Sequence, residues 1–254
     1  MEPVAGQILT PEYRENLVAL SYVISVLGSF AALQCARWMI RPDGRTDWAM
    51  VAGAAVSLGG VGIWAMHFIG MLAYRVGVNV SYEVIPTVAS LVAAIGLSGL
   101  ALYLTGGRGK FRISGWLAGS FLAGLGVAAM HYIGMYAMNM RATMSLDAFT
   151  VALSVLIAVG AASAALWMAF NLSRWTYRLI AAFVMGVAVC MMHYVGMTAA
   201  TLICTSAEPA GFLTLRAWRM EFWVVLVSIV VLSYVFWIST SRLVDKALTT
   251  PSPT

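Results

Sequence analysis

Apolar residues run along this chain in seven long stretches, and the short segments between them carry most of its charge. A helix needs roughly 20 apolar residues to cross a bilayer, so each stretch predicts one transmembrane helix. The predicted spans are Leu17–Met39, Trp48–Ala73, Val84–Leu104, Ile113–Met138, Phe149–Phe170, Leu179–Leu202 and Phe222–Ile238. They predict an all-α, polytopic membrane helix bundle.

Composition supports the same class. Hydrophobic residues make up 61% of the 254 residues and charged residues only 10%, a profile typical of a chain whose solvent is lipid. No stretch between the spans is long enough to fold as a soluble domain. The cysteines number three, and an odd count without an evident extracytoplasmic pair argues against a disulfide framework.

The connecting segments differ in positive charge, which predicts the orientation, because cytoplasmic loops are enriched in Lys and Arg. Alternate segments carry ten such residues, namely Arg37, Arg41, Arg45, Arg108, Lys110, Arg112, Arg174, Arg178, Arg242 and Lys246. The others carry five, namely Arg14, Arg75, Arg141, Arg216 and Arg219. We therefore expect the N-terminus outside and the C-terminus in the cytoplasm. This bias accounts for the net charge of +5, and no basic cluster is long enough to suggest nucleic-acid binding.

One hexapeptide occurs three times and contains every histidine of the chain. The copies are Met66–Met71 (MHFIGM), Met130–Met135 (MHYIGM) and Met192–Met197 (MHYVGM). Each lies on an even-numbered predicted span, and the histidines are 64 and 62 residues apart. The chain is thus predicted to contain three parallel helical hairpins followed by a seventh helix. Close helix packing explains the glycine of each copy but not the histidine, because an unpaired imidazole in lipid is costly.

Helical geometry sorts the donors within each copy. At 100° per residue, the methionine four residues after a histidine lies about 40° from it. The methionine that precedes each histidine points about 100° to the other side. Imidazole nitrogen and thioether sulfur are donors for soft or borderline transition metals. The candidate metal ligands are therefore His67, His131, His193, Met66, Met71, Met130, Met135, Met192 and Met197.

The depth of the three histidines can be estimated from the nearest cytoplasmic arginine. His67, His131 and His193 follow such an arginine by 22, 19 and 15 residues, which is roughly 33, 28 and 22 Å of helix. All three are expected in the outer half of the membrane, with His193 the deepest. Cys190, three residues before His193, is an additional candidate donor.

At these motifs the sequence resembles the MHYT family of bacterial integral membrane sensor domains, over roughly residues 16–202. The resemblance implies a six-helix domain whose Met, His and Tyr residues hold copper near the outer face of the cytoplasmic membrane and sense oxygen, carbon monoxide or nitric oxide. It carries over to Met66, His67, Met130, His131, Tyr132, Met192, His193 and Tyr194. Phe68 departs from the pattern, as do Ile or Val where the family has Thr.

The predicted division of the chain is an extracytoplasmic segment over 1–16, the MHYT-like domain over 17–202, and a seventh helix with a short cytoplasmic tail over 203–254. Family members often carry cyclic-di-GMP enzymes as output domains, whereas no such domain is expected here. The readout then passes to a separate cytoplasmic or membrane protein, or the sequence is a piece of a longer protein.

Three functions remain open at this point. The first is a copper-binding sensor or signalling module for a diatomic gas, and the second is a metal-handling or assembly factor for a redox enzyme. The third is an electron-transfer subunit with haem between two of the histidines. A proton-coupled transporter fits least, since the spans hold almost no ionisable residues for a relay. Catalysis is not expected, because no nucleophile–base pair or paired carboxylates stand out.

Overall fold

The computed structural model describes residues 3–107, 111–207 and 213–249. Seven helices in this part are long and apolar enough to cross a membrane, which confirms the predicted all-α bundle. They are α1 (Glu15–Ala36), a continuous second span made of α2 (Trp48–Ala55), η1 (Val56–Ala65) and α3 (Met66–Ala73), then α4 (Val84–Gly106), α5 (Ile113–Tyr136), α6 (Ala148–Asn171), α7 (Trp175–Thr198) and α8 (Ala217–Thr249).

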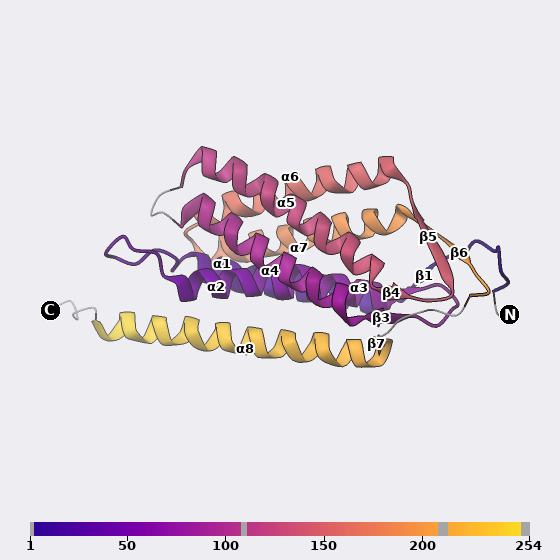
Figure 1. Cartoon of the computed structure of the whole chain (residues 1–254). Coiled ribbons are helices and arrows are strands. Elements are labelled where there is room, and N and C mark those ends of the chain that lie inside the picture. The colour runs from indigo at the N-terminus through magenta and orange to yellow at the C-terminus, as the bar shows by residue number, and fades with distance from the viewer. Residues whose placement is uncertain (1–2, 108–110, 208–212, 250–254) are drawn as a thin grey trace.

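Six of the spans close into a ring. Each helix packs on the next along the chain, and α7 returns to pack on α1. Glycines allow the closest approaches: Gly28 of α1 lies against the backbone of Gly62, and Gly59 lies against the backbone of Ala94 in α4. The last helix, α8, runs outside the ring along α1 and the second span (Figure 1). The second span is consequently the most deeply enclosed one.

The second span contains a π-helical segment, η1, which includes Gly59, Gly60 and Gly62. Helices of this kind have wider turns, so they advance less per residue than an α-helix, and they are frequent at functional sites. In this chain η1 leads directly into the first hexapeptide, which forms the start of α3.

Short strands, not anticipated from the sequence, gather at one end of the bundle beside the N-terminal segment (Figure 1). They connect the helices in three small antiparallel sheets ordered β1-β2, β4-β3-β7 and β5-β6. Their bounds are β1 Glu12–Tyr13, β2 Tyr74–Arg75, β3 Ser81–Glu83, β4 Met138–Asn139, β5 Ala142–Leu146, β6 Ala200–Cys204 and β7 Thr214–Arg216. This is the end predicted to face outward, while the opposite end carries Arg37, Arg41, Arg45, Arg112, Arg174 and Arg178 of the larger basic set. Arg108 and Lys110 of that set lie outside the described residues, and the orientation itself stays a prediction.

Candidate metal centre

The three histidines, each from a different helix, meet on the axis of the ring. The Nδ1 atoms of His67 and His193 are 3.0 Å apart, those of His67 and His131 3.2 Å, and those of His131 and His193 3.3 Å. The planes of the three imidazole rings make angles of 77–88° with one another. The three side chains are 0–1% exposed.

This triangle cannot be satisfied by hydrogen bonds alone. The Nδ1 atom of an imidazole either carries a proton or offers a lone pair. Around a ring of three such atoms, at least one neighbouring pair must be alike, so that two lone pairs or two N–H groups face each other at 3.0–3.3 Å. A cation at the centre removes this conflict, because three lone pairs then converge on one positive charge.

The size of the triangle suits a metal ion. A point equidistant from the three nitrogens lies about 1.8 Å from each, and moving it about 0.8 Å along the axis brings the distance to the ~2.0 Å of imidazole–metal bonds. His67, His131 and His193 would together hold such an ion and leave it able to take a further ligand. The described residues offer no carboxylate or cysteine to this cluster.

The glycine of each hexapeptide makes room for a histidine of another copy. A Cβ atom on Gly134 would collide with Nε2 of His67, one on Gly196 with Nε2 of His131, and one on Gly70 with Nε2 of His193. Each Nε2 is buried and, among the described residues, without a hydrogen-bond partner. When Nδ1 binds a metal, the proton resides on Nε2, against the glycine backbone of the neighbouring motif.

The aromatic residue after each histidine packs edge-on against that imidazole, with ring centroids 4.7–5.0 Å apart. Tyr132 hydrogen-bonds to Ser154 of α6 at 2.7 Å, and Tyr194 to Ser21 of α1 at 2.9 Å. The first copy has Phe68, and there Ser90 of α4 accepts from the Trp64 indole instead, at 3.1 Å.

These three serines were missed by the sequence reasoning, although a signal existed. Ser21, Ser90 and Ser154 are fully buried, and each also donates to the carbonyl three residues earlier in its helix. They recur at intervals of 69 and 64 residues on the odd spans, close to the spacing of the histidines. Each serine thus anchors a motif helix to the helix that follows it around the ring.

The expectation that His193 lies deeper than the other two histidines is wrong, since all three share one layer. The error came from the reference residue: Arg178 lies four residues inside α7 and is buried, whereas Arg174 is the N-cap. Counted from the N-caps Asp47, Arg112 and Arg174, the histidines lie 67 − 47 = 20, 131 − 112 = 19 and 193 − 174 = 19 residues along. The second span has one more residue between its N-cap and its histidine than the other two spans, and it is the span that contains η1.

The centre lies near the strand-bearing end of the bundle. His67, His131 and His193 precede the ends of their helices by five or six residues, or about 8–9 Å. Strand β1 covers this end: Tyr13 packs on Tyr74 and Tyr194, and burial raises the pKa of Tyr13 to about 12. Next to it, Arg14 donates to the Leu72 carbonyl at the end of α3.

The six candidate methionines, Met66, Met71, Met130, Met135, Met192 and Met197, are all buried, with 0–2% exposure. Ligation by their sulfur atoms stays a prediction. Cys190 is placed differently from the expected donor: its thiol interacts with Ser21, beside the Tyr194 hydroxyl, and it is outside the histidine cluster.

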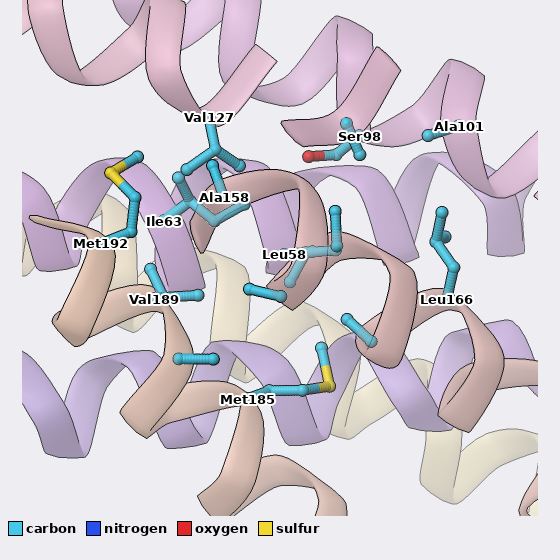
Figure 2. A pocket seen from close by; sticks show the side chains of 15 residues that line it. Leu58, Ile63, Ser98, Ala101, Val127, Ala158, Leu166, Met185, Val189 and Met192 are labelled. Atoms are coloured by element: carbon cyan, nitrogen blue, oxygen red, sulfur yellow. The ribbon is translucent and has the colours of Figure 1, made fainter. Parts of the chain in front are cut away.

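An apolar cavity of about 40 Å³ lies on the inner side of the histidine layer, although none of the three histidines lines it. Met192, which precedes His193 in the chain, lines it together with Ile63, Val127 and Val189, and alanines of α6 form much of its wall. The Ser98 hydroxyl is the one oxygen among the side chains labelled in Figure 2. An apolar cavity of this type accepts small apolar molecules.

Comparison with protein families finds one family whose repeats match two regions of the chain. The model of the MHYT family, described as a bacterial signalling protein N-terminal repeat, matches residues 60–119 and 124–182. The chain belongs to the MHYT family. The two matched MHYT repeats contain His67 and His131, and the third copy of the motif, with His193, completes the triangle although it lies beyond them.

Similar curated proteins are signalling proteins with MHYT-like regions. The chain is 39% identical over 198 residues to the bifunctional diguanylate cyclase/cyclic di-GMP phosphodiesterase MucR of Pseudomonas aeruginosa, covering 76% of this chain and 29% of the relative. It is 35% identical over 219 residues to the cyclic di-GMP phosphodiesterase NbdA of the same species, covering 82% and 27%. It is 29% identical to the signaling protein YkoW of Bacillus subtilis, covering 85% and 27%.

The chain therefore spans less than a third of the length of these relatives. No solved structure matches it. What the comparisons establish is a multi-pass membrane domain of a signalling family.

Proposed function

We propose that this chain is a membrane sensor domain that holds one copper ion on His67, His131 and His193 and responds to a diatomic gas. The observation that carries the proposal is the Nδ1 triangle, whose 3.0–3.3 Å edges leave like groups facing each other unless a cation lies between them. Three neutral imidazoles in an apolar surrounding, with no carboxylate in the cluster, favour Cu(I) over the hard cations.

A copper ion held by His67, His131 and His193 alone would supply a binding position for the gas. A reduced copper ion held by three nitrogens can accept one more neutral ligand, either a methionine sulfur or oxygen, carbon monoxide or nitric oxide. Such gases partition into lipid, and the alanine-lined cavity that Met192 helps to form would provide an apolar store close to His193. Gas binding would shift the three histidine side chains and the helices that hold them, which is the differential interaction that a two-state switch requires.

The burial of the site separates this function from the alternatives. A delivery factor must pass its metal to an acceptor by ligand exchange, and side chains that are 0–1% exposed oppose such exchange. A haem group needs its two axial nitrogens on opposite faces of the macrocycle. Nδ1 atoms 3.0–3.3 Å apart leave no room for a porphyrin between them.

We propose that the protein or domain that reads the signal is of the same class as the enzymes in the relatives' names. MucR and NbdA are named for cyclic di-GMP enzymes, so we propose that the signal is read by a protein or domain of that class on the cytoplasmic side. Helix α8, which packs on the second span, is the element of this chain best placed to carry the change.

The proposal is tested on the full chain purified in lipid nanodiscs. Metal analysis should give one copper per chain after loading, and reduced protein exposed to carbon monoxide should show a C–O stretching band. Protein that takes up no copper under these conditions overturns the metal assignment. A copper protein without any spectral response to carbon monoxide, nitric oxide or oxygen overturns gas sensing alone.

The role of the cavity has a separate test. Ala158, buried on the wall of the cavity, is replaced by leucine, with Ala152→Leu on the exposed side of the same helix as control. We expect Ala158→Leu to slow carbon monoxide binding severalfold in flash photolysis while copper content is kept. Equal rates in the two variants would show that the gas reaches the metal by another route.

A further inference from the structure

A second polar site lies at the opposite end of the bundle from the histidines. A recess of about 230 Å³ is enclosed by the C-terminal ends of α1, α4 and α6 and by the beginning of α7. Its lining is Ala36, Arg37, Ile40, Gly106, Phe111, Ala169, Phe170 and Arg178. The only polar side chains that the structure describes in this lining are those of Arg37 and Arg178. Both carry a guanidinium group, so the recess is positively charged.

Arg178 is the unusual member of this lining. It is only 5% exposed, although Arg is rarely buried without a partner. Its Nε donates to the Leu172 carbonyl at 2.8 Å, while its Nη1 is buried and has no hydrogen-bond partner among the described residues. An unpaired buried donor on a charged group is costly, so this side of the guanidinium is expected to meet an acceptor.

Arg37 adds a second charge instead of compensating the first. It is the C-cap of α1, its guanidinium lies over the Trp38 ring at 5.1 Å, and it repels Arg178 electrostatically. Among the described residues the lining holds no carboxylate. The ion pairs of this part of the chain, Arg41–Asp47 and Arg45–Asp43, involve other arginines.

We propose that this recess binds a phosphate-bearing anion, held between Arg178 and Arg37. The planar fork of Arg matches phosphate geometry with paired N–H donors, and an anion there would neutralise two adjacent cations. The surroundings suit a membrane interface: Trp38 and Trp175 flank this end of the bundle, as interfacial belt aromatics do. Basic pockets between transmembrane helices are a recognised setting for anionic lipid headgroups, and a soluble phosphate offers the same chemistry.

The test uses the full chain in a neutral detergent. Thermal unfolding is followed after addition of dioleoylphosphatidylglycerol, of the same amount of dioleoylphosphatidylcholine, or of inorganic phosphate, and bound lipid is counted by native mass spectrometry. The variants are Arg178→Gln and Arg37→Gln. Arg174→Gln is the control, because Arg174 carries the same charge at the same end of α7 but is exposed and outside the recess.

Phosphatidylglycerol or phosphate should raise the unfolding temperature of the wild type and of Arg174→Gln, whereas phosphatidylcholine should not. Arg178→Gln should bind the anion about tenfold or more weakly, and Arg37→Gln, whose exposed side chain can be changed without disturbing the core, should also weaken it. A response to phosphatidylglycerol alone identifies a lipid headgroup, and displacement of that lipid by phosphate identifies a soluble ligand.

Three results would overturn the site. They are unchanged anion binding in both recess variants, an equal loss in Arg174→Gln, and the absence of any anion-specific effect on the wild type. If Arg178→Gln does not fold, Arg37→Gln measured against Arg174→Gln decides the matter.

Discussion

Replacing Gly134 with alanine adds one methyl group at the place where the His67 imidazole packs. The new Cβ would overlap Nε2 of His67 and would lie 2.9 Å from its Cδ2 and 3.4 Å from its Cε1. Ordinary carbon contacts are 3.5–4.0 Å, so the ring must move by about 1 Å. Metal–ligand distances tolerate only about 0.2 Å. The Nδ1 atom of His67 would therefore move out of bonding range of the proposed copper ion, although His67 itself is unchanged.

We expect Gly134→Ala to weaken copper binding by about 10–100-fold, the usual effect of disturbing the residues that support a ligand. The measurement is a competition titration of the purified, reduced protein against a Cu(I) chelator, with thermal unfolding as a check on the fold. Gly70→Ala and Gly196→Ala displace His193 and His131 in the same way and should behave alike.

Gly96→Ala and Gly160→Ala are the matched controls. Both glycines lie in transmembrane helices, and an added Cβ on either meets nothing within 4 Å. These variants should keep wild-type copper affinity and gain up to about 1 kcal/mol from helix propensity. If Gly134→Ala binds copper as tightly as Gly96→Ala, the packing of imidazole on glycine does not position the ligand, and the reasoning fails.

The remaining predictions concern the ligands, the serine anchors and one helix cap. His67→Ala, His131→Ala and His193→Ala should each abolish copper binding to the same degree, since the three share one triangle; metal analysis showing partial retention in one variant would indicate separate sites. Tyr132→Phe and Tyr194→Phe each lose a hydrogen bond to serine and should lower the free energy of unfolding by about 1 kcal/mol, with copper retained as the natural Phe68 suggests. Hydrogen bonds from Thr150 hold the pKa of Asp147 below its ordinary 3.8, so its cap on α6 stabilises the fold above that pH and is lost as the pH falls through the lower folded-state pKa. The difference in unfolding temperature between wild type and Asp147→Ala should accordingly shrink on acidification, and a constant difference would contradict this.

Much of the fold follows from local rules. Seven apolar stretches of bilayer length determine the helices, and the start predicted at Trp48 agrees with the structure, in which Asp47 before it caps the helix through its carboxylate. The strands of two to five residues escaped prediction because they exist only where neighbouring loops meet. The depth of His193 was misjudged because Arg178 was taken to mark the start of its helix. Arg178 lies inside α7, where its Nε donates to the carbonyl of Leu172, just before that helix.

The sequence predicted which histidines gather in the candidate centre but not how they are arranged. The repeated hexapeptide singled out His67, His131 and His193 because each copy could be compared with the others inside one chain. The partner of each imidazole could not be deduced, because which motif helix follows which around the axis is a property of the closed ring. Gly134 therefore looked like a helix-packing residue, whereas its close neighbour is the His67 side chain.

The cyclic pairing of the motifs bears on how such a domain could arise. Each copy supplies one nitrogen to the axis and one glycine to the histidine of the preceding copy, and the cycle closes because the glycine of the first copy, on α3, meets the histidine of the last, on α7. No copy is special in this cycle, so three identical hairpins related by a threefold axis would satisfy the same contacts. Closed symmetric assemblies are the common route by which identical subunits build a shared site. A single hairpin gene encoding a homotrimer would already possess the centre, and two duplications would turn that trimer into the six-helix ring of the present chain.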